Sequence, residues 1–217
     1  MANITTLLFD LDGTLIDTAP DMAYALNCVL QEQGKPTLPY ATIRPMVSHG
    51  GAALTRLGFG EQRLKAEFEA LRLRFLQIYL QNIARESALF EGFEELLNKA
   101  EQQGLQWGVV TNKPSWLSEP LMQQLNLAQR SSCLVSGDTT LERKPHPEPL
   151  LHACRIIGVQ PQQCIYVGDA ERDIEAGNRA GMRTLAALFG YLSEEDQPTN
   201  WNADGLINHP KELWQWL

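Results

Sequence analysis

The stretch Thr6-Leu7-Leu8-Phe9-Asp10-Leu11-Asp12-Gly13-Thr14-Leu15 contains the residues that decide the fold. Its first part, residues 6–9, is short and apolar enough for a strand buried on both faces, and Asp10 ends it abruptly. Similar apolar runs follow at residues 107–110, 133–136, 164–167 and 184–187, with a weaker one at 206–207. The chain therefore contains several candidate strands of the buried kind.

Helical patterns separate these candidate strands. Residues 93–103, 147–157 and 174–180 have apolar residues at helical spacing, and Gly104, Gly158 and Gly181 follow the three patterns. Glycine is common just after the C-terminus of a helix. An alternation of strands and helices predicts an α/β fold, a doubly wound parallel sheet with helices on both faces.

One long region interrupts this alternation. Residues 17–86 have helical periodicity and no strand signal, and Leu64, Phe68, Leu71, Phe75 and Ile78 form one apolar stripe suited to core packing on a long helix. We therefore expect a catalytic core of residues 1–16 and 87–217, and a helical cap of residues 17–86 inserted after the first strand. Hinges are expected near residues 16–18 and 85–90.

Composition limits the possible partners. The 217 residues carry a net charge of −8, which argues against nucleic acid or an anionic membrane as a partner. No apolar run approaches the roughly 20 residues of a membrane span, and the first residues do not resemble a signal peptide. We expect a cytoplasmic protein with a small-molecule substrate, whose oligomeric state is left open.

Asp10 and Asp12 are the first candidates for chemistry. In an extended segment, residues two apart share a face, so both carboxylates point toward one small volume. Two such anions repel each other unless a cation joins them, and a divalent metal would do so. A helix-capping acid followed by a turn glycine, Gly13, would give the same local pattern.

Polar residues follow the later candidate strands as well. Thr111 and Asn112 come after residues 107–110, Lys144 comes after 133–136, and Asp169 comes after 164–167. In an open parallel sheet, the ligand crevice lies at the carboxyl ends of the strands, so these residues are expected to converge there. A hydroxyl and backbone N–H groups at such a place suit the binding of phosphate oxygens.

Together these residues resemble the four motifs of the haloacid dehalogenase superfamily. The matching segments are Asp10-x-Asp12-Gly13-Thr14, Thr111-Asn112, Lys144-Pro145 and Gly168-Asp169-x-x-x-Asp173, and the helical insert resembles the type 1 cap of that family. Among its branches the chain is most similar to phosphoglycolate phosphatases. The segments 107–114, 144–150, 190–201 and 209–210 are also similar to bacterial N-acetylmuramic acid 6-phosphate phosphatases.

The resemblance implies a hydrolase of phosphate monoesters and a role for each motif residue. Asp10 would be the nucleophile that forms an aspartyl phosphate. Asp12 would protonate the leaving alkoxide and later deprotonate the attacking water. Thr111 and Lys144 would face the phosphoryl oxygens, and Asn112 would bind substrate beside them.

The resemblance also implies Mg²⁺ as the cofactor. Its ligands would be Asp10, the backbone carbonyl of Asp12, and Asp169. Asp173 would lie just outside these ligands and orient Lys144 or a metal-bound water.

The choice of substrate is expected to depend on the cap. Arg44, Ser48, His49 and Gly50 belong to a polar turn that can approach a ligand closely, although a plain helix break would look the same. An arginine at position 44 can pair with a carboxylate through a planar fork. Both phosphoglycolate and N-acetylmuramic acid 6-phosphate carry such a carboxylate.

Three other functions share part of this pattern. A sugar-phosphate mutase of the same superfamily would have every core residue, and would differ by releasing no inorganic phosphate. A receiver-type signalling module also combines acids, a threonine and a lysine on a parallel sheet, but it needs neither the spacing of Asp10 and Asp12 nor the helical insert. A phosphate-ligand binding protein without turnover would not need an intact set of catalytic positions.

Overall fold

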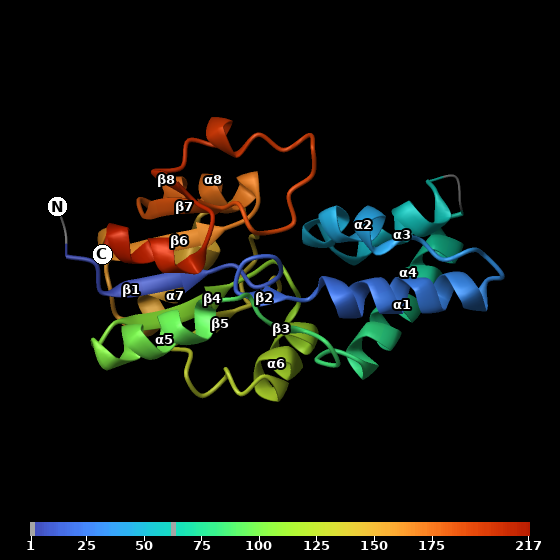
Figure 1. Cartoon of the computed structure of the whole chain (residues 1–217), viewed down its shortest axis with the longest axis horizontal. Coiled ribbons are helices and arrows are strands. Elements are labelled where there is room, and N and C mark those ends of the chain that lie inside the picture. The colour runs from blue at the N-terminus through green and yellow to red at the C-terminus, as the bar shows by residue number, and fades with distance from the viewer. Residues whose placement is uncertain (1–2, 62–63) are drawn as a thin grey trace.

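The computed structural model describes residues 3–61 and 64–217, and it contains a six-stranded parallel sheet (Figure 1). Its strand order is β5-β4-β1-β6-β7-β8. These strands are β1 (Thr6–Phe9), β4 (Gln106–Val110), β5 (Leu134–Val135), β6 (Cys164–Gly168), β7 (Arg183–Ala187) and β8 (Gly205–Ile207). The predicted doubly wound sheet is confirmed, with β1 at its centre between β4 and β6.

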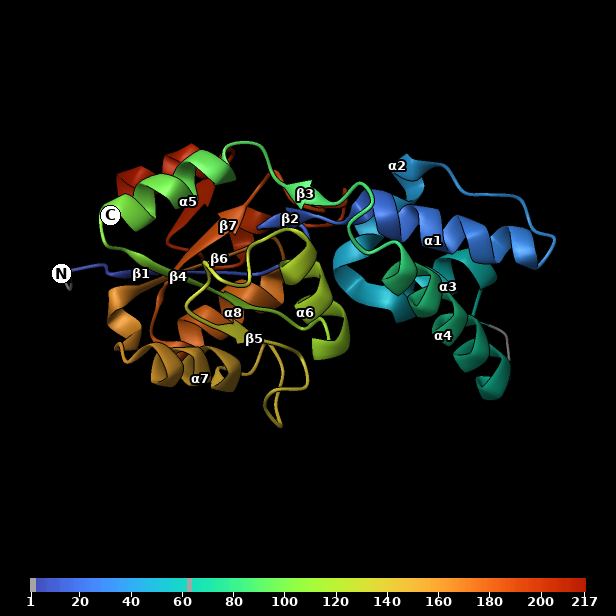
Figure 2. The same ribbon diagram turned by 90° about the horizontal axis from the view of Figure 1, so that it is seen from below.

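Strand β1 is buried on both faces, as its apolar sequence requires. Leu7 and Phe9 point into one hydrophobic cluster and Leu8 into another, and none of the three is exposed. Figure 2 shows α5 (Phe93–Gln102) and the C-terminal 3₁₀ helix η4 (Pro210–Trp216) on one face of the sheet, and α7 (Glu148–Ile157) and α8 (Glu171–Ala180) on the other. Helices on both faces explain why the strands lack polar alternation.

The predicted ends of the core helices agree with the structure. Gly104, Gly158 and Gly181 all have positive φ, between 76° and 81°; Gly158 and Gly181 directly follow their helices, and Gly104 follows α5 after one residue. Helix α8 begins at Glu171, earlier than the predicted 174, because Asp173 accepts a hydrogen bond from the backbone N–H of Ala170 at 3.1 Å. A side-chain acceptor of this kind stabilises the first turn of a helix.

Helices fill the inserted region. They are α1 (Ala19–Glu32), α2 (Tyr40–Ile43), η1 (Arg44–His49), α3 (Gly50–Phe59) and α4 (Lys65–Gln81). They lie beyond the carboxyl ends of the strands, on the same side as α6 (Ser115–Gln124) (Figure 1). The short antiparallel strands β2 (Ile16–Asp17) and β3 (Ala88–Leu89) pair where the chain enters and leaves this helical region.

The apolar stripe predicted for the long helix is confirmed in the C-terminal part of that helix. Leu71, Phe75 and Ile78 are buried, whereas Phe68 is partly exposed and its ring lies 5.4 Å from the guanidinium of Arg56. Leu64 is 73% exposed, so its place in the stripe was wrong. Its backbone is extended just before α4 begins, and its side chain therefore does not follow the helical period.

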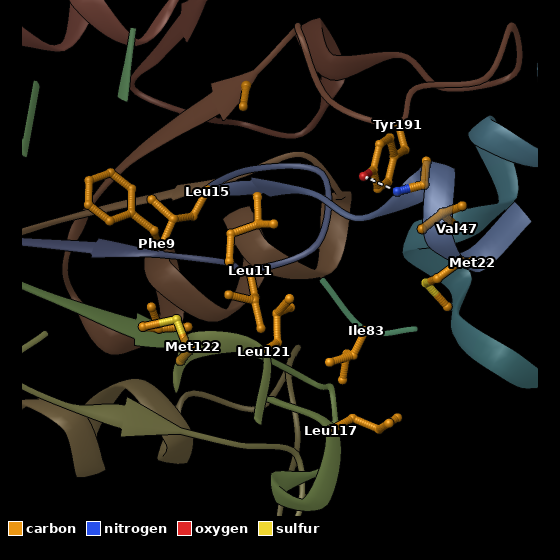
Figure 3. Close-up of a cluster of buried hydrophobic side chains, with 14 of the residues drawn as sticks. Phe9, Leu11, Leu15, Met22, Val47, Ile83, Leu117, Leu121, Met122 and Tyr191 are labelled. Carbon is orange, nitrogen blue, oxygen red and sulfur yellow. Dashed lines mark hydrogen bonds between the residues drawn. The ribbon is translucent and has the colours of Figure 1, made fainter. Parts of the chain in front are cut away.

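The inserted helices share a hydrophobic cluster with the sheet. Figure 3 shows Leu11 and Leu121 near the sheet and Met22 and Val47 on the inserted helices, all within this cluster. The helical region therefore rests on the core through apolar contacts. Among the described residues, no helix is both long and apolar enough to cross a membrane.

Candidate active site

The turn after β1 forms the floor of the site. Asp10 continues the sheet, because its N–H donates to the carbonyl of Val167 at 2.9 Å. Gly13 turns the chain with φ +85°, and a Cβ at this position would lie 2.2 Å from Oδ2 of Asp169. Only glycine therefore permits this turn so close to the carboxylate that follows β6.

Three carboxylates meet behind the turn. Asp10, Asp169 and Asp173 are buried, and each offers an oxygen within 4.8 Å of the others. Lys144 reaches this carboxylate trio, with its Nζ 2.8 Å from Oδ1 of Asp10 and 2.7 Å from Oδ1 of Asp173. Its side chain is fully buried, and Lys144 together with the nearby Arg172 supplies two positive charges to three buried carboxylates.

Lys144 makes its hydrogen bonds with other groups than Oδ1 of Asp10 and Oδ1 of Asp173. Its ammonium donates to the carbonyl of Val110 at 3.0 Å and to the hydroxyl of Tyr166 at 2.8 Å. Within the described residues, Oδ1 of Asp10 and Oδ1 of Asp173 accept no hydrogen bond. Their contact with Lys144 is therefore an ion pair without hydrogen-bond geometry.

The carboxylate trio fits a divalent cation. Burial, together with the negative charges of Asp10 and Asp173, raises the pKa of Asp169 to about 7. Mg²⁺ prefers a few carboxylate oxygens and would relieve both the charge repulsion and the missing donors. These residues therefore suit the metal that the sequence predicts.

The carboxylate of Asp12 has other partners. Its Oδ1 accepts hydrogen bonds from the hydroxyl of Thr18 at 2.6 Å and from Nζ of Lys113 at 2.8 Å. Burial lowers the pKa of Lys113, but the interactions with Asp12 and Tyr79 together outweigh burial and raise this pKa above its usual value. Lys113 is therefore a buried ammonium held beside a carboxylate. The expected metal contact of Asp12 is its backbone carbonyl, which leaves the side chain for this pair.

Thr111 and Asn112 follow β4, as predicted, at the same edge of the sheet. The hydroxyl of Thr111 accepts a hydrogen bond from the N–H of Lys113 at 3.1 Å. The side chain of Asn112 makes two hydrogen bonds with the backbone of Lys144, at 3.0 and 3.1 Å. Asn112 thus positions the loop that carries Lys144, a role the sequence did not suggest.

A cavity of about 640 Å³ opens above these residues. Its lining includes the predicted site residues Asp10, Asp12, Thr111 and Asn112 of the core and Ser48, His49 and Gly50 of the inserted helices. Lys144, Asp169 and Asp173 lie behind Asp10 and join the site through their contacts with it. The structure therefore brings together most of the residues that were expected to form one site.

Arg44 is the exception, because the cavity lining does not include it. Its guanidinium donates to the backbone carbonyls of Gly190 at 3.0 Å and Phe189 at 3.1 Å, and lies 5.0 Å from the ring centre of Tyr191. The fork predicted to hold a substrate carboxylate holds two backbone carbonyls of the core instead. Arg44 thus connects η1 to the loop after β7.

The cavity is also lined by cationic side chains that the sequence did not single out. They are Arg72, Lys113, Arg143 and Arg172. Lys113 directly follows Thr111-Asn112, and Arg172 lies between the motif acids Asp169 and Asp173, so motif position could have suggested both. Nothing in the local sequence marks Arg72, which reaches the cavity from α4.

Comparison with known proteins agrees with this arrangement. A family model described as haloacid dehalogenase-like hydrolase matches residues 7–187, which includes all four motifs and the helical insert. The chain belongs to this family. The predicted resemblance is therefore confirmed.

Members of the family with similar sequences carry two different names. A phosphoglycolate phosphatase of Xanthomonas campestris pv. campestris is 47% identical over 209 residues, covering 96% of this chain and 94% of the relative. An N-acetylmuramic acid 6-phosphate phosphatase of Pseudomonas putida is 46% identical over 210 residues, covering 97% of this chain and 94% of the relative.

A solved structure shows the same fold over the whole chain. The crystal structure of a predicted phosphoglycolate phosphatase from Haemophilus somnus 129pt has a TM-score of 0.88 and 26% identity, and covers 100% of this chain and 99% of that one. The α/β core with its helical insert is therefore shared with that protein.

Proposed function

We propose that the protein is a Mg²⁺-dependent phosphatase that hydrolyses a small phosphate monoester through an aspartyl phosphate on Asp10. The observation that carries this proposal is the position of Asp10, which lies on the cavity floor and in the buried carboxylate trio at once. A carboxylate there can reach a phosphorus atom in the cavity, while Lys144 at 2.8 Å orients it.

The chemistry follows from the residues around Asp10. Its carboxylate oxygen attacks phosphorus, the ester P–O bond breaks, and Asp12 gives its proton to the leaving alkoxide. Water then attacks the phosphorus of the aspartyl phosphate, and Asp12 takes the proton from that water as inorganic phosphate leaves. Thr111 lines the cavity and faces the phosphoryl oxygens, and the ammonium of Lys144, behind Asp10, adds positive charge that favours the charge that spreads over them.

The metal would be held by Asp10, Asp169 and the backbone carbonyl of Asp12. When bound, Mg²⁺ supplies positive charge that offsets the negative charge of the trio and the phosphoryl group. Asp173 keeps Lys144 in place through their 2.7 Å ion pair. The helical region of residues 17–86 would act as the cap that excludes water from the cavity.

The cavity also supports a substrate with a second anionic group. Arg72, Arg143 and Arg172 line it in addition to the residues assigned to phosphate. Such cations favour a carboxylate on the leaving group, as in phosphoglycolate and N-acetylmuramic acid 6-phosphate. Leu73, Leu76 and Trp116 line it as well, so its surface is partly apolar.

The volume of the cavity favours the larger of these two substrates. About 640 Å³ greatly exceeds the volume of a two-carbon acid phosphate. Apolar and aromatic side chains in the lining suit the faces of a sugar ring. We therefore favour N-acetylmuramic acid 6-phosphate, with phosphoglycolate as the second candidate because similar phosphatases carry that name.

Phosphate release from three esters tests the proposal. The substrates are phosphoglycolate, N-acetylmuramic acid 6-phosphate and N-acetylglucosamine 6-phosphate, the last of which has the same sugar without the lactyl carboxylate. We expect Mg²⁺-dependent release, with the highest kcat/KM for the muramic acid ester. Conversion of a sugar phosphate into an isomer without phosphate release would support a mutase instead.

A further inference from the structure

The ammonium of Lys113 joins a residue of the core to a residue of the inserted helices. Its Nζ lies 2.8 Å from Oδ1 of Asp12 and 2.9 Å from the hydroxyl of Tyr79 in α4. It also lies 4.5 Å from the centre of the Tyr79 ring, within the range of a cation–π contact. Asp12, Lys113 and Tyr79 therefore form one connected chain of contacts.

Burial makes this chain of contacts rigid. The side chain of Lys113 is 4% exposed and Tyr79 is fully buried, whereas the Asp12 side chain is 16% exposed at the cavity. A lysine side chain has many rotamers in water, and ordering it has an entropy cost that these contacts must offset. Asp12 and Lys113 line the cavity, whereas Tyr79 does not.

Two anchors define the position of the Asp12 carboxylate oxygen. The hydroxyl of Thr18 holds it from the segment that leads into α1, and Lys113 holds it from the loop after β4. Lys113 is in turn held from α4 by Tyr79. One of the two anchors of the Asp12 carboxylate, Lys113, is thus itself in contact with α4.

We propose that Lys113 is a positioning residue for Asp12, and that Tyr79 places Lys113, so that seating of the inserted helices aligns the acid–base carboxylate. This rests on the proposed role of Asp12 in phosphate ester hydrolysis. A positioned acid is needed where the leaving group is a poor one, because an alkoxide must be protonated as the P–O bond breaks. A good leaving group needs no such proton.

The test compares two leaving groups by kcat/KM, which reports the steps up to cleavage of the ester bond. The substrates are the best alkyl phosphate of the panel above and p-nitrophenyl phosphate, whose nitrophenolate leaves without a proton. For Lys113→Met we expect kcat/KM to fall at least about tenfold on the alkyl phosphate and less than about threefold on the aryl phosphate, since general acid catalysis contributes roughly a hundredfold or more.

Tyr79→Phe keeps the ring and removes the hydroxyl, so it keeps the fold while it loosens Lys113. We expect kcat/KM of Tyr79→Phe to fall more on the alkyl phosphate than on the aryl phosphate, as for Lys113→Met, but by a smaller factor. Tyr24→Phe, on α1 and 40% exposed, is the matched control and should leave both substrates unchanged. If Lys113→Met does not fold, Tyr79→Phe decides the question alone.

A double substitution separates positioning from direct action on substrate. In an Asp12→Asn background, Lys113→Met should have little further effect on the alkyl phosphate, because the residue that it positions is already lost. A full additional loss in that background, or equal losses on the alkyl and aryl phosphates, would overturn the proposal. If the wild-type protein released no phosphate from any ester, the proposed function itself would fail, which is a different outcome.

Discussion

The hydroxyl of Ser48 donates a hydrogen bond to Oδ2 of Asp169 at 2.8 Å. Ser48 belongs to η1 in the inserted helices, whereas Asp169 follows β6 and is one of the carboxylate trio. The N–H of Tyr191 donates to the same oxygen at 2.9 Å. The position of the helical region and the charge state of the candidate metal site are therefore linked through one carboxylate.

Replacing Ser48 by alanine should weaken Mg²⁺ binding. The hydroxyl favours the charged form of Asp169, and its loss leaves that carboxylate with one donor fewer. We expect the dissociation constant of Mg²⁺ near neutral pH to rise about threefold to tenfold, measured by titration calorimetry. Ser131→Ala is the control, because its hydroxyl donates to the carbonyl of Cys133 just before β5 and contacts none of the three carboxylates. Equal affinities for the wild type and Ser48→Ala would show that the hydrogen bond does not influence the metal site.

Mg²⁺ binding should also depend on pH near neutrality. The pKa of Asp169 is raised to about 7 by burial and by its anionic neighbours, so below that pH the metal must displace a proton. We expect the affinity to rise with pH, by up to about tenfold per unit, and to level off above about pH 7. Calorimetry in buffers of different ionisation enthalpy would count the released protons, and a flat profile would contradict the prediction.

The raised pKa of Asp169 also predicts how the stability of the metal-free protein changes with pH. A carboxyl group whose pKa is raised in the folded state stabilises the fold at low pH, and this contribution is lost as the pH rises through about 7. We expect Mg²⁺ to raise the thermal unfolding midpoint more at pH 8 than at about pH 6. Thermal melts with and without Mg²⁺ would test this, and Asp169→Asn should remove the difference.

Asp10→Asn should abolish phosphate release and keep the fold. The amide has nearly the same shape, but it is a far weaker nucleophile than the carboxylate. We expect kcat to fall at least about a thousandfold, with a circular dichroism spectrum like that of the wild type. A variant that retained a tenth of the wild-type turnover would contradict the assignment of the nucleophile.

Arg44→Ala should affect all substrates equally. Its guanidinium binds the carbonyls of Phe189 and Gly190, so its loss loosens η1 from the core and removes no group that lines the cavity. We expect similar losses of kcat/KM on N-acetylmuramic acid 6-phosphate and on p-nitrophenyl phosphate. A loss confined to the ester that carries a carboxylate would restore the role in substrate recognition that the sequence suggested. Arg72→Ala is the matched variant, because Arg72 does line the cavity.

Much of the core site could be predicted from the sequence. Asp10, Thr111, Lys144 and Asp169 each follow a short apolar run, and parallel strands bring their carboxyl ends to one edge of a sheet. The convergence of these residues therefore follows from the order of apolar runs and polar residues along the chain. It could be predicted without knowing any particular side-chain contact. The helical nature of the insert followed in the same way from the period of its apolar residues.

Only the tertiary structure decided how the inserted helices meet the core. Arg44 is near the site along the chain, but the packing of η1 turns its guanidinium toward Phe189 and Gly190. Lys113 and Tyr79 lie 34 residues apart, and their contact exists because α4 packs over the loop after β4. Local periodicity determines which face of a helix is apolar. It does not determine where that face lies on a distant part of the chain, because that depends on the shapes of both surfaces together.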